Sequence, residues 1–374
     1  MTVAALRGRL LPPALAIVFA VLLCVVVVLI SGGSPATALS AMVTQVGEGT
    51  TAVDIVNSAA VYYLAALAVA IGFQMNLFNI GVEGQFRLAA CVAAIVGGML
   101  TLPPVLHVIV IFLVAAVVGA AWAGIAAVLL AYRGVSEVIS TIMLNFIAIG
   151  LIAYLIRDDT FGVLQGNNIS TQPIAPSGAF PGISLGGGGT VFGMVLVSAA
   201  LGVGYWFLLG RTRFGFELKA SGISSTAATA GGVNARRMVI IALLMSGAVA
   251  GLAGLPELLG RDMAYTLTSP AGYGFTGIAI ALLGRNHPVG IAFGAVLWAF
   301  LDKAGLALDN VGIPREIVLI MQGSIVLSVV VAYEIVRRWD LAAEQRRVAA
   351  ELAPADADPG GGPAAQAEEG SVRS

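Results

Sequence analysis

Long, nearly uninterrupted runs of apolar residues constrain this chain more than any other feature of its sequence. Over the 374 residues, 59% are hydrophobic and only 10% are charged. A helix needs about 20 mostly apolar residues to cross the roughly 30 Å hydrocarbon core of a bilayer. The sequence therefore predicts an all-α, polytopic helical membrane protein with about 10 transmembrane segments, and it excludes an ordinary soluble domain.

One of the predicted transmembrane helices is broken. The segment 274–284 is too short to cross a bilayer alone, and with 288–303 it predicts a helix interrupted near Arg285. The chain also contains 47 glycines, and small residues favour closely packed membrane helices. The remaining predicted spans are 13–30, 55–73, 86–102, 106–131, 137–156, 190–209, 237–259 and 316–336.

The distribution of positive charge predicts that both termini lie in the cytoplasm, because fifteen of the 19 Lys and Arg residues then fall on the cytoplasmic side. Residues 1–352 are expected to form the transmembrane domain. Residues 353–374, rich in Ala, Pro, Gly and acidic residues, are expected to be a disordered cytoplasmic tail. The first apolar run is either a retained span or a signal peptide cleaved near residue 38.

A polar block at residues 74–85 interrupts the apolar pattern between two predicted spans. It is expected to be a helix break, a polar pathway or a turn at the membrane surface. Its amide side chains are candidate path residues that offer weak hydrogen bonds to a solute. These are Gln74, Asn76, Asn79 and Gln85. For Glu83, an ion pair with Arg87 at i, i+4 is favoured over a place in the path.

A second polar pattern lies in the segment that follows Ser136. Glu137, Thr141 and Asn145 recur at i, i+4 and i+8, so they share one helix face. This face is expected to avoid lipid, because polar groups in contact with hydrocarbon are costly. Two interpretations stay open, a lining of the solute path by Thr141 and Asn145 or an interhelical hydrogen-bond clamp.

The loop 210–237 differs from the other connections. Ser224 or Ser225 is suited to cap a short helix that runs to Ala230, and Gly231 is suited to end it. A short helix of small residues fits a groove on another protein. The alternative is a simple solvated loop.

Several classes of function are excluded or disfavoured. The chain contains no Gly-Lys dipeptide and hence no Walker A loop. Its two histidines, His107 and His287, have no His or Cys at metal-ligand spacing, and His107 is expected at a helix end at the outer interface. A net charge of −1 without a basic patch gives no indication of nucleic acid as a partner. The chain is not expected to be an enzyme or to bind a cofactor itself.

Four ordered segments over about residues 55–335 resemble bacterial ABC importer permeases of the nucleoside and simple-sugar subfamily, which is related to the ribose and branched-chain amino-acid permeases. The segments are 78–85, 137–145, 213–222 and 277–288.

The resemblance implies a bacterial plasma-membrane protein with several partners. These are a cytoplasmic ATPase that binds the ATP, a second related permease and an extracellular substrate-binding lipoprotein. It also implies that the loop 210–237 couples to the ATPase. The residues concerned are Glu217, Ala220, Gly222, Ser224, Ala227, Ala228 and Gly231. Nucleosides and simple sugars both fit as solutes. The alternative function is an ion-gradient-driven secondary transporter, which predicts carboxylates deep in the membrane.

Overall fold

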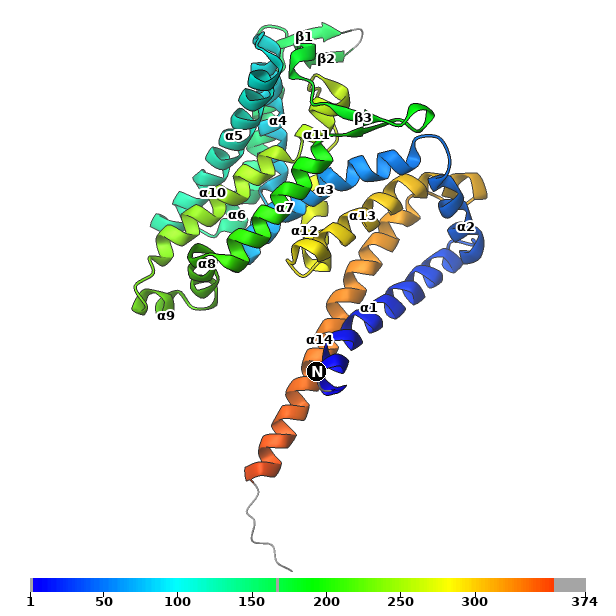
Figure 1. Cartoon of the computed structure of the whole chain (residues 1–374), viewed down its shortest axis with the longest axis vertical. Coiled ribbons are helices and arrows are strands. Elements are labelled where there is room, and N and C mark those ends of the chain that lie inside the picture. The colour runs from blue at the N-terminus through cyan, green and yellow to red at the C-terminus, as the bar shows by residue number, and fades with distance from the viewer. Residues whose placement is uncertain (1–2, 166–167, 353–374) are drawn as a thin grey trace, which may run out of the picture.

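The computed structural model describes residues 3–165 and 168–352, and helices dominate this part of the chain (Figure 1). The predicted tail 353–374 lies outside the described residues. The helices are α1 (Val3–Ile30), α2 (Pro35–Val46), α3 (Thr51–Phe73), α4 (Val82–Met99), α5 (Pro104–Arg133), α6 (Glu137–Leu155), α7 (Met194–Arg211), α8 (Arg213–Ile223), α9 (Ser225–Ala230), α10 (Ala235–Leu252), α11 (Leu255–Glu257), α12 (Tyr273–Leu283), α13 (Pro288–Ala304) and α14 (Ile317–Leu352).

The number of spans agrees with the all-α membrane fold predicted from the sequence. Among the described residues, eight helices are long and apolar enough to cross a membrane, or nine if the bent pair α1 and α2 counts as one span. The predicted broken helix is confirmed, since α12 and α13 are separate helices joined by a turn at 284–287. The helix α12 has only 11 residues, too few to cross a bilayer alone.

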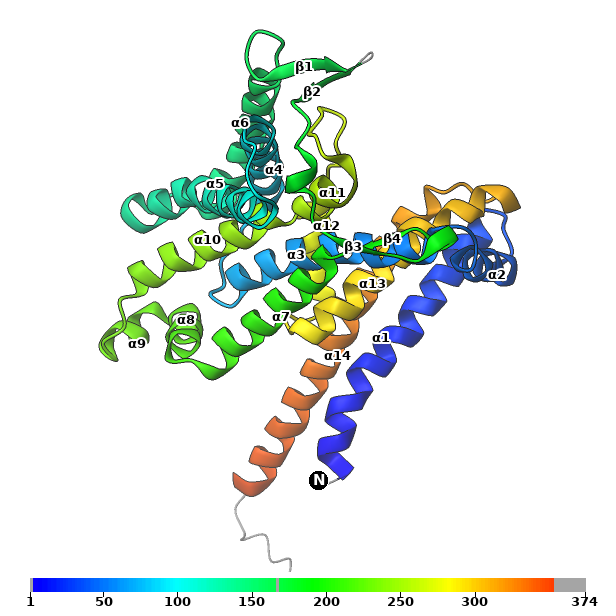
Figure 2. The same cartoon turned by 45° about the horizontal axis from the view of Figure 1, so that its top comes forward.

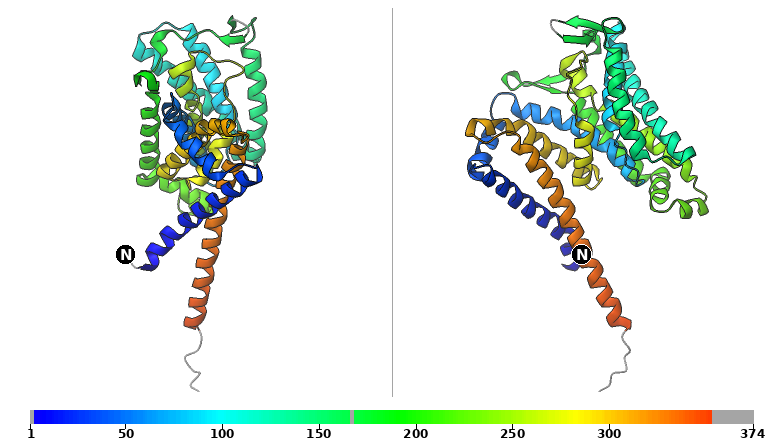
Figure 3. Two further views of the ribbon diagram at one scale, coloured as in Figure 1. Left: turned by 90° about the vertical axis from the view of Figure 1, so that its right-hand side faces the viewer. Right: turned by 180° about the vertical axis from the view of Figure 1, so that it is seen from behind.

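The helices form a main bundle and an arm. In Figures 1 and 3, α1 and α14 lie side by side and extend away from the other helices. Figure 2 shows α5 and α10 packed along each other, with α3 crossing beneath the β3–β4 hairpin toward α13. The pair α8 and α9 lies at the end of the main bundle opposite the β1–β2 hairpin (Figure 1). The two long loops therefore occupy opposite ends of the bundle.

The loop between α6 and α7 is more ordered than the sequence predicts. It contains two antiparallel hairpins, β1 (Gly162–Gln165) with β2 (Asn168–Thr171) and β3 (Gly182–Ser184) with β4 (Thr190–Phe192). His107 fixes this loop, because its Nδ1 lies 2.8 Å from Ser177 Oγ and its Nε2 lies 2.9 Å from the Gly97 carbonyl oxygen. His107 lies in the first turn of α5, as predicted for a residue at a helix end, and it is fully buried within the protein.

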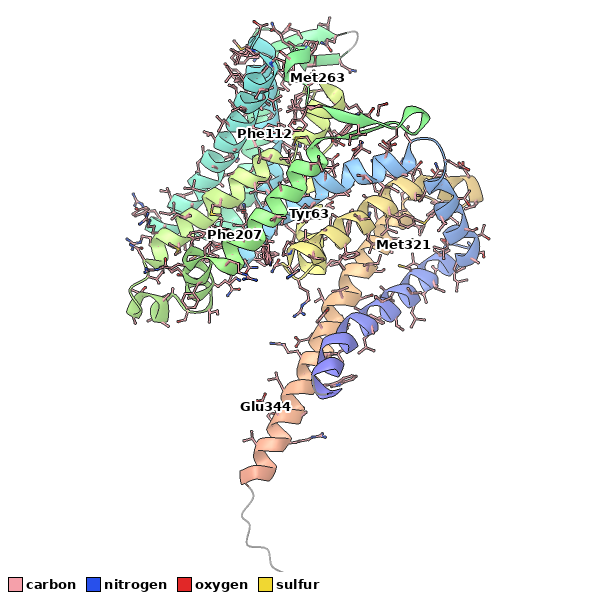
Figure 4. All side chains as sticks on the ribbon, in the orientation of Figure 1. Tyr63, Phe112, Phe207, Met263, Met321 and Glu344 are labelled. Carbon is pink, nitrogen blue, oxygen red and sulfur yellow. The ribbon has the colours of Figure 1, made fainter. Side chains whose placement is uncertain are left out.

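Side-chain packing links the same loop to the helices. Figure 4 labels Phe112 on α5, and its ring lies 5.9 Å from that of Phe180 in the loop. The figure also places Tyr63 between α3 and α7, where its hydroxyl occupies the space that a Cβ on Gly202 would fill. Aromatic side chains therefore fill the positions that small residues leave open.

Glycine permits a close helix contact between α5 and α10. A Cβ on Gly119 would collide with the carbonyl oxygen of Gly247, and one on Gly251 would collide with that of Ala115. In a membrane, van der Waals contact of this kind drives helix association, because lipid tails are as apolar as the side chains. The spacing of Gly247 and Gly251 is the G-x-x-x-G pattern that suits such a contact.

We expect Gly247→Leu to separate α5 from α10 and to lower the melting temperature of the purified protein by several degrees. Overpacking of this kind costs about 1–3 kcal/mol or more. The matched control is Gly204→Leu on α7, where a Cβ would meet no atom within 4 Å. Equal melting temperatures for the two variants would contradict the packing argument.

Candidate functional site

The polar block begins where α3 ends in a left-handed turn. Asn76 has a φ of 54°, a conformation that Asn tolerates better than most residues. The Leu77 N–H bonds the Gly72 carbonyl at 3.0 Å, and the Asn76 N–H bonds the Phe73 carbonyl at 3.1 Å. These two bonds form a Schellman cap, which satisfies carbonyls that the ended helix leaves free. The block is therefore a helix break.

Two amide side chains of the block bond each other inside the bundle. The Asn79 Nδ2 donates to Gln85 Oε1, and the Gln85 Nε2 donates to Asn79 Oδ1, both at 3.0 Å. Asn79 also donates to Ser246 Oγ of α10 and accepts from the Gly81 N–H. Ser246 in turn donates to the Ala68 carbonyl at 2.6 Å. Both amides are buried, and their donors and acceptors are used within the protein.

The polar stripe of α6 (Glu137, Thr141 and Asn145) contacts the polar block 74–85 from the other side. Asn145 Oδ1 accepts from the Gly84 N–H at 2.8 Å, and Asn145 Nδ2 donates to the Ile80 carbonyl at 3.0 Å. Glu137 Oε1 accepts from the Phe78 N–H at 3.3 Å, while Thr141 is fully buried. The stripe faces the bundle interior, and its contacts are those of the interhelical clamp rather than of an open channel.

The first two amides of the block point toward the α8 side. Asn76 Nδ2 donates to the Gly222 carbonyl of α8 at 2.7 Å. Gln74 Nε2 donates to the Tyr205 hydroxyl at 3.0 Å, and this hydroxyl donates to the Asn286 carbonyl at 2.7 Å. Two of the predicted path residues thus connect the predicted coupling loop to the turn between α12 and α13.

The predicted coupling loop contains the short helix expected from its residues. Ser224 caps α9 by accepting from the Ala227 N–H at 3.2 Å, and the helix ends at Ala230 before Gly231. Glu217 pairs with Arg213 at 2.6 Å on α8. Ala227 is exposed, whereas Ala228 is buried. Ala220 and Gly222 are partly covered, and Gly222 lies against Met75.

Two exposed apolar side chains on α8 were missed in the sequence. Phe216 is 72% exposed and Ile223 is 85% exposed. They are seven residues apart and so lie on one face of the helix. The signal was present, since apolar residues at i and i+7 in a short loop helix indicate a contact surface.

The carboxylate of Glu83 does not make the predicted ion pair. Among the described residues, its two oxygens accept from the Gly272 N–H at 2.8 Å and the Gly274 N–H at 2.9 Å. Glu83 therefore caps the N-terminus of α12, where a negative charge is stabilised by the helix dipole. Arg87 lies instead near Tyr265, a residue whose pKa is raised by burial and lowered in part by this guanidinium. The prediction was wrong because the partner is 189 residues away in sequence.

Aromatic and acidic side chains gather beside the start of α12. The ring of Tyr273 lies 5.6 Å from that of Tyr62 and 5.5 Å from that of Phe86. The Tyr273 hydroxyl donates to Glu257 at 2.8 Å, and the Tyr62 hydroxyl donates to Asp302 at 3.3 Å. We name these five residues the aromatic–acid cluster. Acidic residues within or beside apolar runs were the available sequence signal.

A bundle of apolar helices, broken at two polar turns and carrying an exposed helix pair at one end, defines a multi-pass membrane permease. Residues 51–330 match the family described as "branched-chain amino acid transport system / permease component", and the chain belongs to this family.

Three relatives extend the comparison. The chain is 33% identical to the guanosine ABC transporter permease protein NupP of Bacillus subtilis, over 88% of this chain and 95% of NupP. It is 34% identical to the glucose ABC transporter permease protein TsgB13 of Haloferax volcanii, over 79% and 80% of the two chains. It is 30% identical to the nucleoside ABC transporter permease protein NupB of Lactococcus lactis, over 87% and 92%. The chain is thus the permease subunit of an ABC importer, a component that works with an ATPase and a substrate-binding partner.

We expect Asn145→Leu to destabilise the protein, because it leaves the Gly84 N–H and the Ile80 carbonyl unpaired in the interior. Each buried unpaired group costs about 1–3 kcal/mol. The melting temperature of the purified protein should fall by several degrees, while Asn310→Leu at an exposed position should leave it unchanged. Lost uptake with an unchanged melting temperature would instead place Asn145 in the solute path.

Proposed function

We propose that this subunit carries nucleosides across a bacterial plasma membrane. Two of the three relatives above are named for guanosine or nucleoside transport, and one is named for glucose. In this proposal a second, related permease completes the transporter, and an extracellular lipoprotein delivers the solute. The ATP is bound by the partner ATPase, and the permease has no ATPase site of its own.

The observation that carries the proposal is the contact between the helix pair α8–α9 and the polar block. Asn76 bonds the Gly222 carbonyl, so displacement of α8 also displaces the break between α3 and α4. The cytoplasmic ATPase is proposed to dock on this helix pair, where Phe216, Ile223 and Ala227 are exposed. Closing of the ATPase on ATP would then move the helices that bound the path.

The six path candidates named from the sequence carry no charge. Of the six path candidates, Asn79, Gln85, Thr141 and Asn145 are buried, and their contacts hold the break. Gln74 and Asn76 lie nearer α8 and share hydrogen bonds with it and with Tyr205. The substrate-binding partner supplies most of the affinity, so the permease needs only weak contacts with the solute.

The proposed solute class is tested by uptake in cells that lack other nucleoside transporters and express the complete transporter. Radiolabelled guanosine should accumulate and radiolabelled glucose should not. In inverted vesicles, guanosine transport should require ATP hydrolysis. It should continue when the ion gradient is collapsed. Glucose uptake without guanosine uptake would overturn the nucleoside proposal, and transport driven by an ion gradient alone would favour the secondary-transporter alternative.

We expect Phe216→Asp to abolish docking of the ATPase, because a carboxylate would replace an apolar side chain at the centre of the contact. Co-purification of the ATPase with the permease should fall at least tenfold. The matched control is Leu164→Asp on β1, which is also 72% exposed but lies at the opposite end of the bundle. If the ATPase still co-purifies with Phe216→Asp, the α8–α9 face is not its docking surface.

A further inference from the structure

The aromatic–acid cluster brings together side chains from five helices. Tyr62 comes from α3, Phe86 from α4, Tyr273 from the first position of α12 and Asp302 from the last turn of α13. Glu257 ends α11. The helices α3, α4 and α13, which pack against α12, therefore each contribute a side chain to the cluster.

The position of Tyr273 in this cluster is fixed by the polar block. Glu83 accepts from the N–H groups of Gly272 and Gly274, the residues on either side of Tyr273. A Cβ on Gly274 would collide with the Glu83 backbone, so α12 starts in direct contact with α4. Glu83 is thus a positioning residue, and it aims the Tyr273 ring at Tyr62 and Phe86.

The carboxylates of the cluster have free hydrogen-bond acceptors, whereas the amides of the polar block already bond each other. Glu257 accepts one hydroxyl at 2.8 Å, and its nearest guanidinium, that of Arg261, is 3.9 Å away. Asp302 accepts from Tyr62 and lies 3.2 Å from the Lys303 ammonium. A carboxylate offers about four acceptor positions, so both groups have lone pairs left. By contrast, Asn79 and Gln85 bond each other.

A small cavity of about 20 Å³ adjoins the cluster and contains an unused donor. Phe86, Glu257, Tyr265 and Tyr273 are among its lining residues. Tyr265 is 4% exposed, and its hydroxyl lies beside the Arg87 guanidinium. Neither this hydroxyl nor Arg87 Nε has a hydrogen-bond partner within the described part of the chain. Buried polar groups of native proteins are almost always paired, and an exception points to a missing partner. The cavity holds one water molecule at most, so the cluster is closed in this conformation.

We propose that the aromatic–acid cluster is the part of the transport path that contacts the solute, and that it selects a nucleoside. The proposal rests on the function proposed above. When the helices part, the base stacks against Tyr273 and Phe86, and the ribose hydroxyls donate to Glu257 and Asp302. Tyr265 supplies a donor to an acceptor atom of the solute.

The chemistry of the cluster favours a nucleoside over the other solute classes. Aromatic faces hold a flat base by offset stacking over its whole π face, whereas a hexose offers only C–H groups to the same rings. The vicinal hydroxyls of ribose provide the donors that the two carboxylates accept.

The role of the carboxylates is tested by comparing the maximal uptake rates of guanosine and 2′,3′-dideoxyguanosine in the complete transporter. The wild type should favour guanosine by about tenfold, the factor that a hydrogen bond to a charged group supplies. Glu257→Gln and Asp302→Asn should each slow guanosine and leave the dideoxy analogue little changed, so the ratio falls toward one. The control Asp158→Asn, an exposed acid in the outer loop, should keep the wild-type ratio.

A purely structural role of the two acids would slow both solutes equally and leave the ratio unchanged, and that result would overturn the proposal. This failure is distinct from failure of the proposed function. If the wild type imports no nucleoside at all, both fall. If it imports guanosine and the ratio is the same in every variant, only the cluster proposal falls.

The stacking contact is tested by photolabelling the purified transporter with 8-azidoguanosine and mapping the label by mass spectrometry. The label should fall on the segments that carry Tyr62, Phe86 or Tyr273. Tyr273→Phe keeps the ring and should keep the label, whereas Tyr273→Leu should lose it. The control Tyr154→Leu, at an exposed position of α6, should label normally. A label on residues 137–145 or 74–81 would overturn the proposal.

Discussion

The structure depends on one constraint, which is that backbone polar groups inside a membrane must find partners within the protein. Two turns, at residues 74–81 and 284–287, break helices and free carbonyl and N–H groups there. The first turn is tolerated because Asn79 and Asn145 supply the missing partners. These polar side chains thus allow α3 to end inside the bundle of an otherwise apolar chain.

The same hydrogen bonds join parts of the molecule that must move together during transport. The break contacts α8 through Asn76, reaches the turn after α12 through Gln74 and Tyr205, and caps the start of α12 through Glu83. Both ends of α12 are therefore tied to one short segment. A displacement of α8 therefore reaches α12 through a series of direct hydrogen bonds, and the segment links the two helices.

Local patterns in the sequence predicted most of the fold. Apolar run length located the spans, and the broken helix at α12 and α13 followed from a run too short to cross a membrane. The α9 helix was predictable because Ser224 and Gly231 act on neighbouring residues. The partner of Glu83 was not, since a helix pattern favours Arg87 while tertiary packing brings Gly272 closer. The aromatic–acid cluster was missed for the same reason, because its members are scattered from Tyr62 to Asp302.

Glu83 also bears on what the broken helix can bind. In transporters with discontinuous helices, the positive end of a half-helix commonly faces an anionic group of the substrate. Here a carboxylate of the protein already occupies that end of α12, with both oxygens on backbone N–H groups. The dipole is therefore neutralised internally, and a second negative charge would be repelled. A broken helix whose N-terminus is already capped by a carboxylate suits a neutral solute. Glu83, which occupies this anion site, also positions Tyr273.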